Sequence, residues 1–221
     1  PENTIHPKGG HFYCESYQEF TDRFVLDNGS WSGWKTVNGI SYYFAENNAL
    51  KGIHKVPGIN DESNEYFYRF NETTGACEGK VTGLIELDGA TYYAINGIAR
   101  SGWWNLTDES GEENYYYFSP QTLQAVTGNQ AIDGYNYIFS EHKLIRGDFV
   151  KDSKGTHYRW AGEWMCNKWI ELDGNKYYLG YGPNGYVQTG IFHIYEYPTR
   201  YAADENGVWQ ENLTGLFDYN G

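Results

Sequence analysis

Aromatic side chains are the residues of this chain whose number and spacing could do chemistry. The 221 residues include 22 Tyr, 11 Phe and 8 Trp, which together make up 19 % of the sequence. A flat aromatic face can stack on the C–H face of a sugar ring or attract a cation to its π electrons. Many of these aromatics have Asn, Asp or Gln nearby in the sequence, and such side chains can bind hydroxyl groups. The composition therefore favours non-covalent recognition.

Residues that could catalyse a reaction lack catalytic spacing. No HExxH, no GxSxG and no Gly-rich phosphate loop occurs. Carboxylate pairs are easily found among 29 Asp and Glu, but a thin repeat array offers few deep clefts that would shift their pKa values. We predict no enzyme, no catalytic residue, no cofactor and no metal. We interpret the six histidines as polar residues of loops or strands. They are His6, His11, His54, His142, His157 and His193.

Charge and cysteine content exclude further classes. The net charge of −13 would repel nucleic acid, because nucleic-acid binding relies on clustered Lys and Arg. Cys14, Cys77 and Cys166 are far apart, odd in number and without a CxxC, so we predict neither a disulfide framework nor a zinc site. No stretch approaches the roughly 18 apolar residues of a membrane helix, so we predict no membrane insertion.

The aromatics belong to a unit that is clearest in residues 33–52, GWKTVNGISYYFAENNALKG. It opens on Gly-Trp, turns at Asn38-Gly39, returns through Tyr42-Tyr43-Phe44 and turns again at Asn47-Asn48. Asn-Gly between two runs of β-favouring residues is the strongest short signal for a hairpin. The unit is therefore predicted to be one β-hairpin followed by a loop.

Imperfect copies of this unit fill most of the chain. Successive units open 19 to 31 residues apart, at Gly33, Gly52, Gly83, Gly102, Gly128, Gly147, Lys168, Gly190 and Gly215. A period of roughly 20 to 50 residues marks a repeat architecture. We predict an all-β solenoid of stacked β-hairpins, with about eight imperfect units of roughly 19–31 residues. Residues 1–23 are predicted to be a lead-in or a degenerate repeat, and residues 24–221 an array that stops within a further repeat of a larger polypeptide.

We predict that the extra residues of the longer units lie in loops. The acidic segments 59–65 and 108–113 are interpreted as solvated hairpin tips, with a calcium site as the alternative. A third apolar position, two residues after a turn glycine, is predicted to pack between neighbouring units. It is occupied by Trp31, Trp164, Val187 and Trp209.

The second strand of each unit has three consistent columns. Alternate residues of a strand share one face, so two of the columns are predicted to be buried together. The first buried column is Tyr42, Tyr68, Tyr92, Tyr116, Tyr137, Tyr158, Tyr177 and Tyr201. The second is Phe44, Phe70, Ala94, Phe118, Phe139, Trp160, Leu179 and Ala203. The column between them is predicted to face solvent and is Tyr43, Arg69, Tyr93, Tyr117, Ile138, Arg159, Tyr178 and Ala202.

The unit G-W-x-x-x-x-G-x-x-Y-Y-F-x-x-x-x-x-x-x-G resembles the cell-wall-binding repeat family. That family includes choline-binding repeats of pneumococcal surface proteins, glucan-binding repeats of streptococcal glucosyltransferases and C-terminal repeats of clostridial toxins. The resemblance covers about residues 24–221 and is strongest in the units that open at Gly33, Gly83, Gly128 and Lys168. It implies a non-catalytic β-solenoid, extracellular or on the surface of Gram-positive bacteria, whose grooves bind choline or sugars and which targets an attached protein.

The residue before the tyrosine pair separates the two ligand classes. In the choline-binding branch this residue is typically Trp, which works with the Trp of the opening Gly-Trp. Here it is Ser41, Phe67, Thr91, Tyr115, Asn136, His157, Lys176 or Arg200. The opening Trp remains only at Trp34, Trp103 and Trp169. A regular ladder of choline cages is therefore not expected, although isolated cages stay open, and the Ser, Thr, Asn and Lys are more similar to the glucan-binding branch.

We predict a carbohydrate-binding module for an α-glucan or another neutral polysaccharide, held by aromatic stacking. The alternatives are a choline-binding anchor for teichoic acid in the cell wall and a structural stalk or protein-docking solenoid. Trp104 has the strongest individual claim, because it follows another Trp, and packing against the adjacent hairpin is the competing role of every candidate. The predicted ligand-binding residues are Trp34, Tyr43, Tyr93, Trp103, Trp104, Tyr117, Trp169 and Tyr178.

Overall fold

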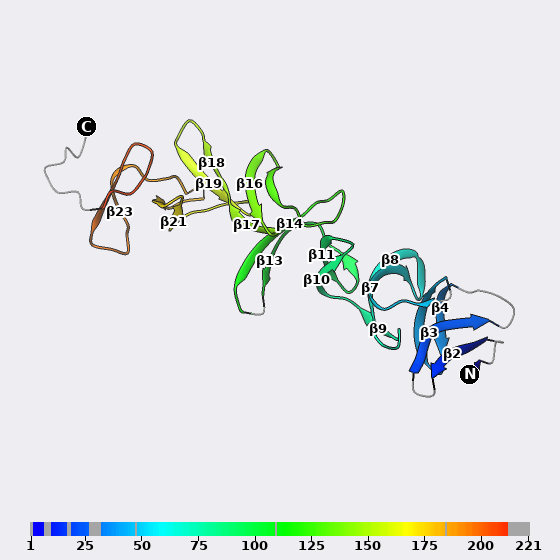
Figure 1. The fold of residues 1–221 in the computed structure, drawn as a ribbon. Coiled ribbons are helices and arrows are strands. Elements are labelled where there is room, and N and C mark those ends of the chain that lie inside the picture. The colour runs from blue at the N-terminus through cyan, green and yellow to red at the C-terminus, as the bar shows by residue number, and fades with distance from the viewer. Residues whose placement is uncertain are drawn as a thin grey trace. The chain divides into compact units, whose positions relative to one another are not determined.

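The structure is a computed structural model that describes residues 2–6, 10–16, 19–26, 32–46, 48–108, 110–183 and 185–211, the first three ranges as backbone alone. Every helix or strand assigned within these ranges is a β-strand (Figure 1). Over the same ranges, no helix is long and apolar enough to cross a membrane. Trp31, Asn47, and the last partial repeat from Gly215, for which we made predictions, lie outside the described residues.

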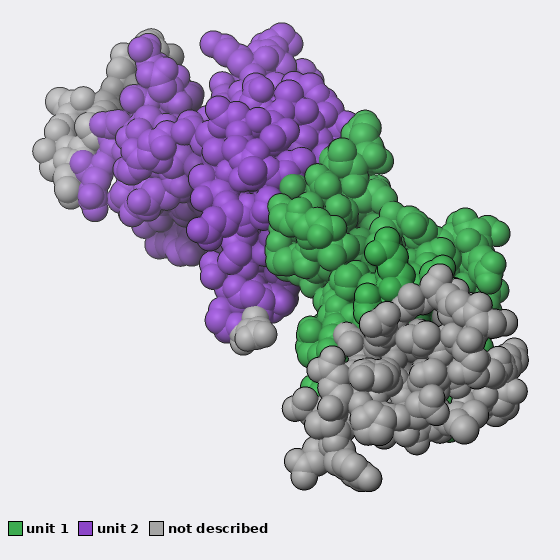
Figure 2. Space-filling view, turned by 45° about the vertical axis from the view of Figure 1, so that its right-hand side comes forward, with its two compact units in different colours: residues 1–102, 118–125 green, residues 103–117, 126–221 purple. Residues whose placement is uncertain are grey.

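Two compact units make up the chain (Figure 2). Unit 1 is residues 1–102 and 118–125, and unit 2 is residues 103–117 and 126–221. Unit 1 contains a six-stranded sheet in the order β1-β2-β3-β6-β5-β4 and the three-stranded sheets β7-β8-β9 and β10-β11-β12. These strands are β1 (Glu2–His6), β2 (Gly10–Ser16), β3 (Glu19–Leu26), β4 (Gly33–Val37), β5 (Ile40–Ala45), β6 (Asn48–Ala49), β7 (Gly52–Gly58), β8 (Asp61–Phe70), β9 (Cys77–Lys80), β10 (Gly83–Leu87), β11 (Ala90–Ile95) and β12 (Ile98–Ala99).

Unit 2 continues the same pattern of small antiparallel sheets. They are β13-β14, β15-β16-β17, β18-β19-β20, β21-β22 and β23-β24. The strands are β13 (Gly102–Thr107), β14 (Glu113–Phe118), β15 (Gly128–Ile132), β16 (Tyr135–Ser140), β17 (Lys143–Arg146), β18 (Asp148–Lys151), β19 (Thr156–Trp160), β20 (Glu163–Trp164), β21 (Lys168–Leu172), β22 (Asn175–Leu179), β23 (Gly190–His193) and β24 (Arg200–Ala203). The predicted all-β array of β-hairpin repeats is confirmed. Assignment of residues 1–23 to a lead-in stays a prediction.

The hairpin turns explain the local register. Asn38 and Gly39 both have positive φ, 52° and 80°, which is the backbone of a type I′ turn and matches the twist of the flanking strands. The same pair of left-handed residues recurs at Asp88-Gly89, Asp133-Gly134 and Asp173-Gly174. As a result, the opening residue of these units pairs with the second buried column, as in Gly33 with Phe44, Gly83 with Ala94, Gly128 with Phe139 and Lys168 with Leu179. Gly190 pairs with Ala203 in the same way across a longer connection.

One predicted loop is mainly strand. Segment 59–65 was expected at a solvated tip, but Asp61–Glu65 belong to β8, and the register shifts between Pro57 and Gly58. Hydrogen bonds hold this bulged end, because Asp61 accepts from Asn64 Nδ2 at 2.9 Å and from the Tyr66 hydroxyl at 2.7 Å. A bulge can therefore absorb extra residues that the sequence suggests are loop.

Both predicted buried columns form the core. In the first, Tyr68, Tyr116, Tyr137 and Tyr158 are buried and the other four tyrosines are half-buried. In the second, every residue is buried except Trp160, which is half-buried. The prediction that the middle column faces solvent is wrong at Tyr178, which is 4 % exposed. There the Phe192 ring stacks on it at 5.7 Å and Asn167 Oδ1 accepts its hydroxyl at 2.8 Å.

Neighbouring hairpins also share backbone hydrogen bonds. Val187 N donates to Thr156 O at 2.7 Å, and Trp209 N donates to Lys176 O at 2.8 Å. Trp164 packs edge-on against Tyr135 at 5.6 Å. These contacts confirm that the third apolar position joins neighbouring repeats at Trp164, Val187 and Trp209. A hairpin is marginal alone, so this docking supplies the stability of each repeat.

Gly162 shows how tightly two repeats of unit 2 pack. It has φ +83°, and a Cβ atom there would lie 2.9 Å from Trp103 Nε1. Gly174 is likewise the second left-handed residue of a two-residue turn, the one between β21 and β22, with φ +78°, and it has no atom within 4 Å of such a Cβ. A comparison of the same substitution at the two glycines therefore separates the cost of backbone strain from the cost of crowding between repeats.

We expect Gly162→Ala to destabilise the chain more than Gly174→Ala. Both alanines must adopt the left-handed conformation, at about 1–2 kcal/mol. Only at Gly162 must Trp103 also move, which adds about 1–3 kcal/mol. Urea unfolding followed by circular dichroism measures both variants against the parent. Equal losses of unfolding free energy would contradict the packing described for Trp103.

Asp152 is a carboxylate with a strongly lowered pKa. Its Oδ1 accepts from the backbone N–H groups of Lys154 and Gly155 at 2.7 and 3.0 Å. Its Oδ2 lies 2.9 Å from Nε2 of the buried His157 and accepts from the Tyr186 hydroxyl at 3.3 Å. The hydrogen bond from His157, followed by the one from the Lys154 N–H, lowers the pKa of Asp152 to about 2.

Because the pKa of Asp152 is lower in the folded chain than its ordinary value of 3.8, its contribution to stability is complete above about pH 4. That contribution is lost as the pH falls from 4 through 2. We therefore expect the unfolding free energy of Asp152→Asn to fall less steeply over this interval than that of the parent. Urea midpoints at pH 2, 3, 4 and 6 measure the difference, and parallel curves for the two proteins would refute it.

Candidate functional site

Three of the predicted ligand-binding residues lie in the packing of unit 1. Trp34 Nε1 donates to Pro57 O at 2.6 Å, and its ring packs edge-on against Tyr43 at 5.4 Å and Tyr68 at 4.9 Å. Tyr93 packs against the buried Phe118, with 6.0 Å between ring centroids. All three predicted residues are half-buried. Their contacts are those of residues that hold hairpins together.

Trp103 and Tyr117 have a similar structural role in unit 2. The Trp103 ring is edge-on to Tyr117 at 5.0 Å and to Tyr137 at 4.9 Å, and it stacks on Phe139 at 5.8 Å. Its Nε1 is buried and lacks a hydrogen-bond partner among the described residues. Alternation along β13 turns the next residue, Trp104, to the opposite face of the strand. Trp103 thus packs into the core, and both tryptophans also line one cavity beside β13.

The Trp104 groove is a cavity of about 490 Å³ within unit 2. Residues from two separate parts of the sequence meet there. It is lined by Trp103, Trp104, Asn105, Glu113, Tyr115, Trp160, Ala161, Glu163, Met165 and Lys168. The sequence singled out only the two adjacent tryptophans of this set for ligand binding. Of the others, Asn105 belongs to β13 itself, and the rest belong to β14, to β19 and β20 with the residues around them, and to β21.

Aromatic walls and polar groups alternate around the Trp104 groove. Tyr115 packs edge-on against Trp160, with 6.2 Å between centroids. Asn105 Nδ2 donates to Glu113 Oε2 at 3.0 Å, which orients an amide and a carboxylate together at the rim. Glu163 and Lys168 are exposed and add an acceptor and a donor. The groove can therefore offer flat apolar faces and hydrogen bonds of both kinds to one ligand.

A second cavity, the Trp169 pocket, has a volume of about 440 Å³. It is lined by Trp169, Ile170, Glu171, Lys176, Tyr201 and Trp209. The Trp169 ring lies 5.4 Å from Tyr201 and 5.7 Å from Trp209, with 64° between planes in both pairs. Trp169 was predicted for ligand binding, whereas Tyr201 and Trp209 were predicted only as packing residues. Tyr178, the remaining predicted residue, packs on Trp169 at 5.2 Å from the buried side.

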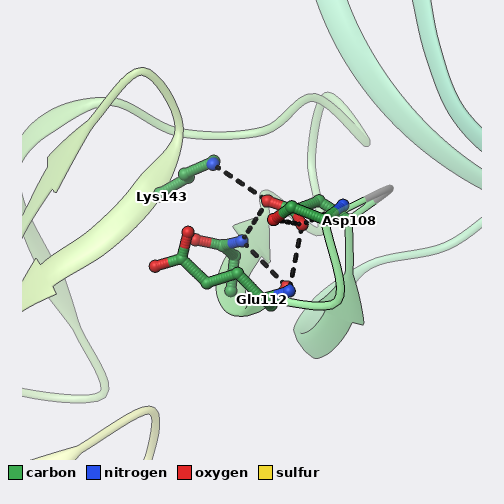
Figure 3. Close-up of polar contacts among 5 residues, drawn as sticks. Asp108, Glu112 and Lys143 are labelled. Carbon is green, nitrogen blue, oxygen red and sulfur yellow. Dashed lines mark hydrogen bonds and ion pairs between the residues drawn. The ribbon is translucent and has the colours of Figure 1, made fainter.

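The acidic tip at Asp108 is organised by its own loop (Figure 3). Asp108 Oδ1 accepts from the Ser110 hydroxyl at 2.6 Å and from the Glu112 N–H at 3.0 Å. Its Oδ2 accepts from Asn114 Nδ2 at 3.2 Å and lies 3.8 Å from Lys143 Nζ. The Ser110 hydroxyl, then the Glu112 N–H, hold the pKa of Asp108 below its ordinary value. Within the described ranges, no three His, Cys, Asp or Glu side chains are grouped as metal ligands.

The fold and the two cavities define a class of protein: a β-hairpin repeat array with aromatic cavities where repeats meet. Comparisons with known proteins show which sequences are similar to these repeats. The chain is 31 % identical to Glucosyltransferase-S of Streptococcus mutans over 164 residues, covering 71 % of this chain and 10 % of that protein. It is 27 % identical to Toxin A of Clostridium novyi over 126 residues, covering 52 % of this chain and 6 % of the toxin.

These two matches confirm the resemblance to the cell-wall-binding repeat family. The chain spans a tenth or less of the length of these curated relatives. No protein-family model matches the chain.

Solved structures of low identity align with most of the chain. CbpF in complex with ipratropium is 18 % identical, covers 94 % of this chain and 95 % of its own, and has a TM-score of 0.31. Alternansucrase in complex with isomaltononaose is 22 % identical, covers 92 % of this chain and 16 % of its own, and has a TM-score of 0.29. TM-scores this low show no common arrangement of the repeats in space.

Proposed function

We propose that this chain is a non-catalytic module that binds a neutral polysaccharide, an α-glucan in the first instance, through the Trp104 groove. The observation that carries the proposal is the combination of Trp104, Trp160 and Tyr115 with the Asn105–Glu113 pair around one open cavity. A pyranose ring needs a flat aromatic face for its C–H groups and paired donors and acceptors for its hydroxyls.

The charge of the chain and the names of its relatives support a neutral glucan. A net charge of −13 disfavours polyanionic ligands. Two relatives, from Streptococcus mutans and Streptococcus downei, are named glucosyltransferases, a name that describes transfer of glucosyl groups. Transfer of that chemistry to this chain is part of our proposal.

A binding role fits the carboxylates better than a catalytic role. Glu113 and Glu163 are exposed, and Glu113 accepts a hydrogen bond from Asn105. A glycosidase needs one carboxyl group that is desolvated enough to stay protonated near neutral pH. Both carboxylates are exposed to water and lack the desolvated surroundings of such a group.

Weak individual sites would suffice for retention on a polymer. One polysaccharide chain that reaches several cavities binds them at high effective concentration, so avidity exceeds the affinity of each site. We propose that the chain thereby targets a larger polypeptide to its polymer, outside the cell or at the cell surface.

We expect Trp104→Ala to weaken retention in native gels that contain dextran or starch. Loss of one aromatic contact of about 1 kcal/mol raises the dissociation constant about fivefold. The control is Tyr195→Ala, which removes an aromatic ring that is 85 % exposed and outside both cavities. Circular dichroism confirms that each variant folds.

The outcomes of this experiment separate the proposed functions. Reduced retention of Trp104→Ala with unchanged Tyr195→Ala supports sugar binding in the groove. Equal retention of parent and both variants would show that the groove is not the site. A parent that no glucan retards would refute sugar binding and favour a stalk, while retention on purified cell wall that free choline relieves would favour choline.

A further inference from the structure

The Trp169 pocket has the shape of a site for an organic cation. Trp169, Tyr201 and Trp209 present rings at steep angles around one cavity, with centroids 5.4 and 5.7 Å from that of Trp169. Aromatic faces in this concave arrangement attract a quaternary ammonium group by cation–π interaction. On its aromatic residues alone, the pocket would bind such a cation.

A side chain of the protein already brings a cation into this pocket. Lys176 lines it, and its Nζ lies 5.5 Å from the centroid of the Trp209 ring, within cation–π range. The backbone fixes this neighbourhood, because Trp209 N donates to Lys176 O at 2.8 Å. Glu171, which also lines the pocket, is the cross-strand partner of Lys176 in the register of β21 and β22. The pocket thus holds one positive and one negative side chain.

At two other places in the chain a basic side chain lies against aromatic rings. In unit 2, the Arg159 guanidinium carbon lies 4.2 Å from the Tyr135 centroid and 4.9 Å from Trp164. In unit 1, Lys80 Nζ lies 3.4 Å from the Tyr66 centroid. Placement of a resident cation against aromatic faces therefore recurs in this chain, and the arrangement at Lys176 is one instance of it.

We propose that Lys176 determines the ligand charge of the Trp169 pocket by excluding organic cations. A second positive charge a few Å from Nζ is repelled, and the Trp209 face that would attract it is already shared. A neutral ring is not repelled and can use Lys176 as a donor and Glu171 as an acceptor. This deepens the proposed function, because it adds a second cavity that selects a neutral ligand.

The test removes the positive charge from the pocket and keeps its aromatic residues. Lys176→Met keeps an unbranched side chain one atom shorter and removes the charge, and Lys176→Arg keeps the charge. Lys151→Met removes the same charge from an exposed position on β18 that does not line the pocket. Each protein is titrated with tetramethylammonium chloride against a sodium chloride blank, and tryptophan fluorescence reports occupancy.

We expect Lys176→Met to bind tetramethylammonium at millimolar concentration and at least about tenfold more tightly than the parent, Lys176→Arg and Lys151→Met. Adding Trp209→Ala to Lys176→Met should abolish the response. Equal affinity in the parent and Lys176→Met would overturn the proposal, as would a folded Lys176→Met that shows no saturable response. Lys176→Gln replaces Lys176→Met if that variant does not fold. No sugar is used, so this inference and the proposed function can fail separately.

Discussion

The structure depends on aromatic packing between hairpins that are each too small to stand alone. A two-stranded hairpin of five-residue strands buries little surface, so its aromatic face must be covered by the next repeat. The type I′ turns make this possible, because they fix a register that places Phe44, Phe139 and Leu179 opposite the residue that opens the unit. Insertions can vary the loops and bulges while that register is retained.

Cavities follow from the same constraint. Where repeats meet, one surface of an aromatic ring completes the core and another can remain accessible, as at Trp169, whose neighbours include the buried Phe192 and the pocket residue Trp209. The residues beside the rings then decide the chemistry of each cavity. Asn105 and Glu113 make the Trp104 groove polar, and Lys176 gives the Trp169 pocket a resident positive charge. One repeated scaffold can thus present different sites without a change of fold.

The sequence was sufficient to predict the repeated hairpins, the turn at Asn38-Gly39 and the two buried columns, because these depend on local alternation and on left-handed turn residues. It did not predict the groove walls, since Trp104 and Trp160 are far apart in the sequence and meet only through the packing of repeats. Tyr178 shows the same limit, because a column that alternation assigns to solvent is buried there by Phe192. The sequence pattern therefore identifies the aromatic residues of each repeat, but it does not show which of their rings remain accessible to a ligand.

The central claim is that the open cavities of unit 2, and not the aromatic core, bind the polysaccharide. Nuclear magnetic resonance of the tryptophan indole N–H groups tests it most directly, because each resonance reports one ring. During titration with isomalto- or malto-oligosaccharides, we predict saturable shifts at Trp104 and Trp160. Trp34, which donates to Pro57 O, should be unchanged. Shifts at Trp34 without shifts at Trp104, or no shift at any indole up to high millimolar sugar, would contradict it.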